Sequence, residues 1–264
     1  MRRFLGFLTA SYVGLLNYLA NRKCIYVLTY HRISDQFPPN ELVIPPRQFR
    51  EQMAYLKKYC HVVGIEKLCD MIAFRKRIEP QRKPQVVITI DDGYRDTFFN
   101  AFPILKGFNI SAAAFLATGF IGTDKKMSRY EQAPSPDMMS WEEVEEMQKA
   151  GNTTFGPHTV SHPHLPTLDY AAQKAEIEES IKTVYAHTGQ EISKQVFCYT
   201  YGEYNEDTLK ILKELGIKIS LTVKPGANNA RTNPLELKRI VVDGRYGAMN
   251  FIMNFCPAIW EGLN

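Results

Sequence analysis

The chain has 264 residues, of which 45% are hydrophobic and 23% are charged, and its formal net charge is +4. These values exclude a disordered, a collagen-like or a polytopic membrane protein, and the length suits one large domain that needs no disulfide or metal to fold. The five cysteines are scattered without a CxxC pair, which excludes a zinc ribbon and a disulfide scaffold and favours a reducing compartment.

An apolar segment opens the chain. Residues 4–20 carry no charge and are flanked on both sides by pairs of basic residues. The segment is shorter than the ~20 residues that span a bilayer, and it has no clear signal-peptide cleavage site. Its apolar side chains share one helical face, so we expect residues 1–23 to form a helix at a membrane interface. A helix docked on the core fits the same pattern equally well.

Short β-rich runs alternate with helical patterns over residues 24–264, which we expect to form one domain. This alternation predicts a mainly parallel sheet with crossover helices, and one unbroken series favours a single distorted (β/α) barrel of about seven strands behind the N-terminal helix. The predicted strands are Ile25–Tyr30, His61–Val63, Val86–Asp91, Ala112–Ala117, Thr153–Phe155, Val196–Tyr199, Ile217–Thr222 and Leu237–Val242. The predicted helices are Arg47–Tyr59, Ile65–Phe74, Thr97–Phe108, Trp141–Ala150, Tyr170–His187, Asn205–Leu215 and Ala248–Ile259.

The basic residues are concentrated in two segments. Residues 1–32 carry five basic and no acidic side chains, and residues 47–83 carry ten basic and four acidic ones. A nucleic-acid-binding protein usually has a larger excess and a known motif, so the sequence predicts no nucleic-acid partner. A basic face of this size still suits a membrane surface or an anionic substrate.

Two adjacent carboxylates, Asp91 and Asp92, end a predicted buried strand and are followed by Gly93. Neighbouring charges there repel each other and lose hydration unless a cation or a hydrogen-bond network compensates. The carboxyl ends of strands are also the edge at which α/β folds build their sites. One carboxylate can then hold a metal while the other faces the substrate. The alternative is a pair that caps the following helix.

His158 and His162 lie four residues apart, after another predicted strand. On one helical turn this spacing places both imidazoles on the same side, a common metal-ligand arrangement. With Asp92 they would form a two-histidine, one-carboxylate site with open positions for water and substrate. Zinc suits these ligands, and Fe(II), Co and Ni use the same ligand types. The neighbouring His164 is interpreted as structural.

Three motifs in this order resemble the metal-dependent polysaccharide deacetylases, carbohydrate esterase family four. The segment ITIDDG resembles the family's TFDDG, HTVSH resembles its H-[ST]-x-x-H, and FCYTYG resembles its F-x-Y-P-Y-G. The resemblance covers roughly residues 25–245. The position of His31, just past the first predicted strand, resembles the circularly permuted branch that includes poly-N-acetylglucosamine deacetylases, in which the acid histidine precedes the aspartate pair.

The resemblance implies a role for each matching residue. Asp91 corresponds to the catalytic base, and Asp92 with the two histidines of HTVSH corresponds to the metal ligands. The backbone N–H of Tyr201 corresponds to a group that stabilises the oxyanion. His31 corresponds to the general acid, and no histidine follows residue 187 to compete for that role.

Further matches concern the surroundings of this site. Arg239 matches a late L-x-R-I segment of the same branch, where a guanidinium could pair with Asp91 and hold it ionised; a surface salt bridge is the alternative. Trp141 matches an aromatic residue near the sugar pocket. Tyr94 and Tyr199 could line a sugar-binding groove, and all three aromatic residues suit core positions equally well.

One position departs from the family. Thr200 stands where the family has proline, which would preset φ and stiffen the loop that presents Tyr201. We therefore expect the oxyanion contact and the pocket shape to differ from the family's. The metal ligands are unaffected by this change.

The resemblance implies a metal-dependent hydrolase that removes N-acetyl groups from an amino sugar in a polysaccharide or a glycan precursor, with residues 24–264 as its catalytic domain. One alternative is a deacetylase or deformylase of a lipid-linked or nucleotide-linked sugar, which the apolar segment and the basic residues would suit. Another is a catalytically silent carbohydrate-binding module, for which Thr200 is the only support. We expect membrane association on the cytoplasmic side, with an extracytoplasmic anchor as the alternative.

Overall fold

The structure is a computed structural model that describes residues 24–76, 83–127 and 137–247. The apolar segment 1–23 and the helix predicted at residues 248–259 lie outside the described residues, so both stay predictions. Among the described helices, none combines the length and the apolar character that crossing a bilayer requires.

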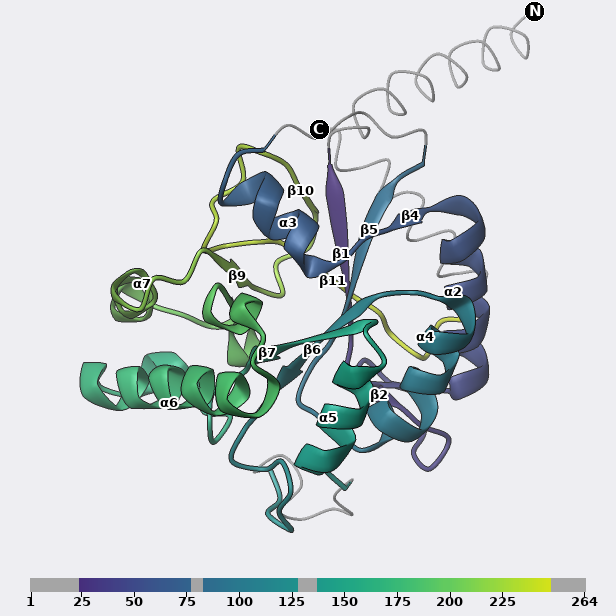
Figure 1. The fold of residues 1–264 in the computed structure, drawn as a ribbon, viewed down its shortest axis with the longest axis horizontal. Helices are drawn as coiled ribbons and strands as arrows, with labels where there is room; N and C mark the ends of the chain where they lie inside the picture. The colour runs from purple at the N-terminus through teal and green to yellow at the C-terminus, as the bar shows by residue number, and fades with distance from the viewer. Residues whose placement is uncertain (1–23, 77–82, 128–136, 248–264) are drawn as a thin grey trace, which may run out of the picture.

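A mainly parallel sheet forms the centre of the fold, with β1 and β5 side by side in its middle (Figure 1). Six of its strands run parallel and only β10 pairs antiparallel with β1. The path is β10 (Ala227–Asn228), β1 (Ile25–Tyr30), β5 (Gln85–Ile90), β6 (Ala112–Leu116) and β7 (Thr153–Pro157), while β11 (Ile240–Val241) pairs with β1 and β4 (His61–Val62) pairs with β5.

A second parallel pair, β8 (Val196–Cys198) and β9 (Ile219–Leu221), forms a separate two-stranded sheet, and β8 contacts β7. Leu221 of β9 forms a parallel bridge with Leu237, and the chain then runs into β11, which pairs with β1. The segment predicted as one strand, Leu237–Val242, therefore consists of two short pairing stretches that link β9 to β1. This arrangement confirms the predicted mixed α/β fold with a distorted barrel of about seven strands.

Helices cover the outside of the sheet. Figure 1 shows α2 and α4 together on one side and α6 and α7 together on the other. The predicted helix Thr97–Phe108 begins with a π-helical turn, η1 (Thr97–Ala101), before α4 continues it. The helices are α2 (Pro46–Tyr59), α3 (Ile65–Ile72), α4 (Phe102–Phe108), α5 (Trp141–Lys149), α6 (Tyr170–Thr188) and α7 (Glu206–Glu214), and the sequence did not predict the short pair β2 (Arg32–Ile33) and β3 (Val43–Ile44).

The alternation of side chains along β1 and β5 sets the position of the site. Even-numbered residues of both strands pack against α2 and α4. Odd-numbered residues such as Ile25 and Val27 face the interior of the barrel, and α3 packs on this cluster. Further along the same inner face come Thr29, Thr89 and finally Asp91. The interior thus changes from apolar to hydroxyl-bearing to charged toward the carboxyl ends of the strands.

Candidate metal centre and catalytic pocket

A cavity of about 530 Å³ lies at the carboxyl edge of the barrel. It collects side chains from the ends of β1, β5, β7, β8 and β11 and from the loops beyond them. Because parallel strands end at one edge, residues far apart in sequence meet here. Eight of the ten predicted site residues line this cavity: His31, Asp91, Asp92, His158, His162, Tyr199, Tyr201 and Arg239.

Three of these residues form a compact set of metal donors. Oδ1 of Asp92 lies 3.4 Å from Nε2 of His158 and 3.1 Å from Nε2 of His162. The three ligand atoms lie within 4.8 Å of one another, and all three residues are buried. Two imidazoles and one carboxylate are a ligand set that zinc and neighbouring divalent metals accept.

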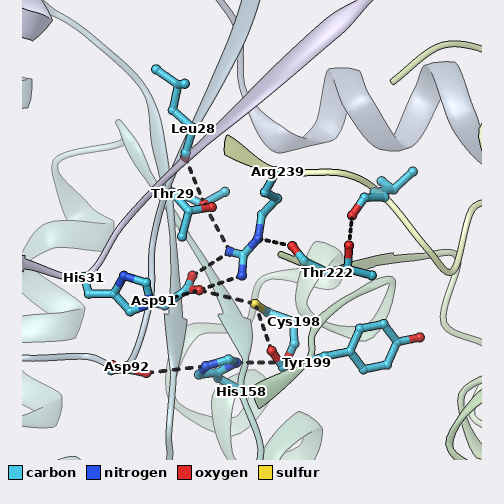
Figure 2. Close-up of polar contacts among 12 residues, drawn as sticks. Leu28, Thr29, His31, Asp91, Asp92, His158, Cys198, Tyr199, Thr222 and Arg239 are labelled. Atoms are coloured by element: carbon cyan, nitrogen blue, oxygen red, sulfur yellow. Dashed lines mark hydrogen bonds and ion pairs between the residues drawn. The ribbon is translucent and has the colours of Figure 1, made fainter. Parts of the chain in front are cut away.

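A hydrogen bond to the backbone orients the first of these imidazoles. Nδ1 of His158 lies 2.8 Å from the carbonyl oxygen of Cys198 and donates to it, which turns Nε2 toward Asp92 (Figure 2). Burial lowers the pKa of His158, but Cys198, Asp92 and Asp91 outweigh it and raise that pKa well above its usual range. The surroundings therefore favour positive charge, and a divalent cation could take the place of the proton.

A second group of possible donors, Asp91, His158 and Cys198, has similar spacing. Both oxygens of Asp91 are already paired with Arg239. Burial raises the pKa of the Cys198 thiol, which disfavours the thiolate form that a metal ligand requires. The Asp92 group is therefore the better metal site.

The segment that carries the histidine ligands is not the predicted helical turn. Residues 158–162 form an irregular loop, in which Thr159 and His162 have φ values of 63° and 55°. The backbone N–H groups of Thr118 and Gly119 donate to carbonyls of this loop, and so hold it against the end of β6. Both imidazoles still point to Asp92, because the loop curls in the left-handed region instead of continuing as a helix.

A glutamate that sequence reasoning missed fastens the outer side of this loop. One carboxylate oxygen of Glu176, in α6, accepts hydrogen bonds of 2.8 Å from the backbone N–H groups of Val160 and Ser161. Its other oxygen accepts from the hydroxyl of Ser161 at 2.6 Å. In the sequence, Glu176 is one of several charged residues in a helix, so no local signal separates it from a solvated side chain.

Strained backbone is concentrated around the cavity. Among the described residues, six that are not glycine have positive φ, and four of them belong to the site: Asp92, Thr159, His162 and Tyr201. Such conformations cost about 1–3 kcal/mol each and persist only where surrounding contacts enforce them. Hydrogen bonds from the surrounding chain, such as those to residues 159–162, therefore hold the backbone of the site in these conformations.

Asp91 and Arg239 form a buried two-pronged ion pair (Figure 2). Nη1 of Arg239 lies 2.9 Å from Oδ1 of Asp91, and Nη2 lies 2.8 Å from Oδ2. Nε of the same guanidinium donates to the carbonyl oxygen of Thr222 at 2.7 Å. Burial raises the pKa of Asp91, but Arg239, assisted by His158 and His31, lowers it below its ordinary value. Asp91 is therefore a charged carboxylate, ready to accept a proton.

Two further groups face Oδ2 of Asp91. Nε2 of His31 lies 4.0 Å from this oxygen, at the end of β1. The thiol of Cys198 approaches it to 3.6 Å and donates a weak hydrogen bond. Sequence reasoning missed Cys198, because a lone cysteine inside a strand has no chemical signature.

A hydrogen bond from the side chain of Thr200 holds the loop that carries Tyr201. The hydroxyl of Thr200 donates to the carbonyl oxygen of Pro163 at 2.5 Å, which ties the Tyr201 loop to the segment just beyond the candidate ligand His162. The Tyr201 ring stacks on His164 with centroids 3.9 Å apart, and Nδ1 of His164 lies 2.8 Å from a carboxylate oxygen of Glu203. These contacts fasten a loop that proline would otherwise stiffen.

The structure does not bring Trp141 or Tyr94 to the cavity. Trp141 stacks on His187 of α6, with ring centroids 3.8 Å apart. Tyr94 is completely buried and its hydroxyl contacts the sulfur of Met127. Tyr199 does line the cavity, although its hydroxyl donates to the carbonyl oxygen of Leu235.

The rim of the cavity includes residues that the sequence did not indicate. Val223 and Val241 are 38% and 37% exposed, which leaves apolar surface at the entrance. Val223 follows β9, and Val241 lies in the two-residue strand β11. These short segments bring the two valines to one entrance only when the barrel closes. Glu41, Leu42 and Asp243 complete the rim.

Comparison with known proteins agrees with this geometry. A family model described as polysaccharide deacetylase matches residues 78–220. The poly-beta-1,6-N-acetyl-D-glucosamine N-deacetylase of Staphylococcus aureus (strain N315) is 27% identical over 235 residues, which cover 86% of this chain and 77% of that protein.

Two solved structures share the fold. The deacetylase PplD of Streptococcus pyogenes, in complex with acetate, superposes with a TM-score of 0.73 at 25% identity, covering 87% of this chain and 97% of that one. IcaB from Ammonifex degensii also gives a TM-score of 0.73, at 24% identity, covering 91% of this chain and 97% of that one.

Proposed function

The chain belongs to the polysaccharide deacetylase family and is a carbohydrate deacetylase, and we propose that it removes N-acetyl groups from an amino-sugar polymer of the poly-N-acetylglucosamine type. One observation carries this proposal. The pocket that holds the charged Asp91–Arg239 pair also holds the metal donors Asp92, His158 and His162.

We propose zinc as the resident metal, held by Asp92, His158 and His162, since two histidines and a carboxylate suit it. A divalent cation bound there would supply Lewis acidity to the acetyl carbonyl and would lower the pKa of a water molecule. The protein must provide the remaining steps: to accept the proton of the attacking water, to stabilise the oxyanion and to protonate the leaving amine.

The side chains in the pocket match these steps. Asp91, held ionised by Arg239, accepts the proton of the attacking water. The backbone N–H of Tyr201 donates to the developing oxyanion. His31, on the far side of Asp91 from Arg239, delivers a proton to the leaving amine. The overall reaction consumes one water and yields acetate and a free amino sugar.

Acetate release tests the proposed function directly. Zinc-loaded protein should release acetate from β-1,6-linked and β-1,4-linked N-acetylglucosamine oligomers, and a chelator should stop release until zinc is returned. Adding Co, Ni or Fe(II) after the chelator compares the metals. If metal-loaded protein releases no acetate from either polymer, the reaction proposed here is wrong. Acetate or formate release only from a lipid-linked or nucleotide-linked sugar would favour that alternative substrate.

We propose that residues 1–23 hold the enzyme at a membrane surface, with the catalytic domain on the cytoplasmic side. The proposal is supported by the uncharged stretch 4–20 and by the basic residues on both of its flanks, which anionic lipids attract. In fractionated cells, the full chain should sediment with membranes and a variant lacking residues 1–23 should not. The full chain should also resist protease added to intact cells. Digestion of the domain in intact cells would mean that it lies on the extracytoplasmic side. If the full chain does not sediment with membranes, residues 1–23 do not hold it at a membrane.

A further inference from the structure

A second pocket opens beside the catalytic one. Its volume of about 380 Å³ falls within the range of ~300–1,000 Å³ that is typical of small-molecule sites. Arg32, Asp35, Gln36, Arg95, Phe99 and Asn100 are among the residues that line it. We call it the Phe99 pocket. None of the residues assigned to catalysis above belongs to it.

An exposed aromatic ring marks this pocket. Phe99, in η1, is 56% exposed, whereas its neighbours Phe98 and Phe102 stack on each other and pack against the core. Phe98 meets the Phe99 ring edge-on at 5.1 Å and limits its rotation. A single exposed aromatic is ordinary on a protein surface. Phe99 differs because it stands at a concavity whose other lining residues, apart from Pro46, are polar.

Two planar polar groups of the pocket each have a hydrogen-bond partner. Nε of Arg95 lies 2.8 Å from Oε1 of Glu143, and its guanidinium lies 4.9 Å from the centre of the Phe99 ring. Nδ2 of Asn100 donates to the carbonyl oxygen of Ile33 at 2.7 Å, which sets the plane of the amide. Guanidinium and amide groups offer several donors in one plane, which suits the hydroxyl groups of a ligand.

Arg32 adds a buried cation to the lining of the pocket. It is 1% exposed, its Nε lies 3.1 Å from Oδ2 of Asp96, and its guanidinium lies 4.0 Å over the ring of Phe37. Its Nη1 has no hydrogen-bond partner among the described residues. Because this atom is itself shielded from solvent, Arg32 contributes buried positive charge to the wall of the pocket and not a donor to a ligand.

The charges of the pocket select the type of ligand. Two arginines line it, and so do three aspartates, Asp35, Asp96 and Asp137. A phosphate or another anion would meet these carboxylates, and a cation would meet the arginines. A neutral molecule with many hydroxyl groups can use both kinds of partner. A sugar ring also presents an apolar C–H face that fits Phe99.

The two pockets are close enough to share one polymer. Arg32 directly follows His31 in the chain, and its backbone N–H donates to the carbonyl of Leu42, a residue on the rim of the catalytic pocket. His31 lines the catalytic pocket and Arg32 lines the Phe99 pocket, so the pair β2–β3 lies between the two. A glycan of several sugar units bound in the catalytic pocket would continue over this pair to Phe99.

We propose that the Phe99 pocket binds a sugar unit of the glycan several positions away from the unit that is deacetylated. This inference rests on the proposed function, because it assumes a polymeric substrate. It predicts a preference for long oligomers that depends on Phe99.

Length-dependent kinetics test this pocket. On a hexamer of N-acetylglucosamine, Phe99→Ala should lower kcat/KM by about three- to tenfold, the size of one aromatic contact, mainly by raising KM. On the dimer it should have no effect, because the dimer does not reach the pocket. Phe99→Trp should retain the preference for the hexamer. Phe74→Ala is the matched control: Phe74 is 51% exposed but follows α3, far from β2 (Figure 1).

Binding measurements separate this inference from the proposed function. In an Asp91→Asn background, the Kd of the hexamer should rise three- to tenfold with Phe99→Ala and should stay constant with Phe74→Ala. Equal effects of Phe99→Ala on dimer and hexamer, or no effect on either, would overturn the assignment of the pocket. If the unaltered enzyme releases no acetate, the proposed function fails, and the Kd comparison still decides whether the pocket binds the glycan.

Discussion

Asp91→Asn should lower kcat for acetate release by about 10²–10⁴-fold while the protein keeps its metal. Asparagine has nearly the same shape and can still accept hydrogen bonds from Arg239, but it cannot take a proton from water. The metal donors Asp92, His158 and His162 do not include the altered group. Steady-state kinetics on the dimer, together with the metal content of the purified protein, measure both parts of the expectation.

The same substitution at Asp70 is the control for this result. Asp70 pairs with Lys76 at 2.8 Å on the surface and is not among the residues that line the catalytic pocket. Asp70→Asn should leave kcat unchanged. A near-native rate for Asp91→Asn would remove Asp91 from the role of base. Loss of metal in parallel with the rate would instead mean that Asp91 supports the metal site.

Arg239→Met should lower the free energy of unfolding by about 3–5 kcal/mol, because it leaves the Asp91 carboxylate buried without its charge partner. Both side chains of the pair are only 1% exposed. Methionine fills much of the same volume, so the loss reports the missing charge more than a cavity. Urea unfolding of the wild type and the variant measures this difference.

A double mutant and a surface pair complete this experiment. When Asp91 is already asparagine, Arg239→Met should cost much less, since no carboxylate is left unpaired. Arg47→Met breaks an exposed pair with Glu51, in which the arginine side chain is 90% exposed, and should change stability by no more than about 0.5 kcal/mol. If Arg239→Met lowers the free energy of unfolding equally with and without Asp91→Asn, and no more than Arg47→Met does, the buried pair has no special role in stability.

The catalytic pocket shows how far sequence reasoning reached. The cost of two adjacent carboxylates at a strand end, the four-residue spacing of His158 and His162 and the family motifs together predict that these residues meet, and all four line the pocket. The helical turn expected for residues 158–162 was wrong, since contacts from β6 and α6 hold that loop in a left-handed conformation. Those contacts come from other parts of the chain and leave no local pattern.

The surroundings of the pocket were less accessible to sequence reasoning. Trp141 and Tyr94 suited both a sugar groove and a core, and only packing separates these choices. Cys198 donates one weak hydrogen bond to Asp91, and Glu176 accepts hydrogen bonds from the loop that carries the histidines. Neither residue belongs to a motif that marks it in the sequence. The contact between Thr200 and Pro163 depends on two loops that meet only in the folded chain.

The sequence by itself predicted the order of most strands and helices and pointed to the candidate metal donors, because the alternation of β-rich and helical runs and the cost of an unpaired carboxylate are local properties. Its modest positive charge, by contrast, indicated only an ordinary globular protein with two basic segments. Tertiary structure alone decided that Arg239 reaches Asp91, that the Thr200 hydroxyl replaces the stiffness of a proline, and that Phe99 stands beside a second polar pocket. Each of these depends on how the barrel closes and brings distant loops together at one edge, which no short stretch of sequence encodes.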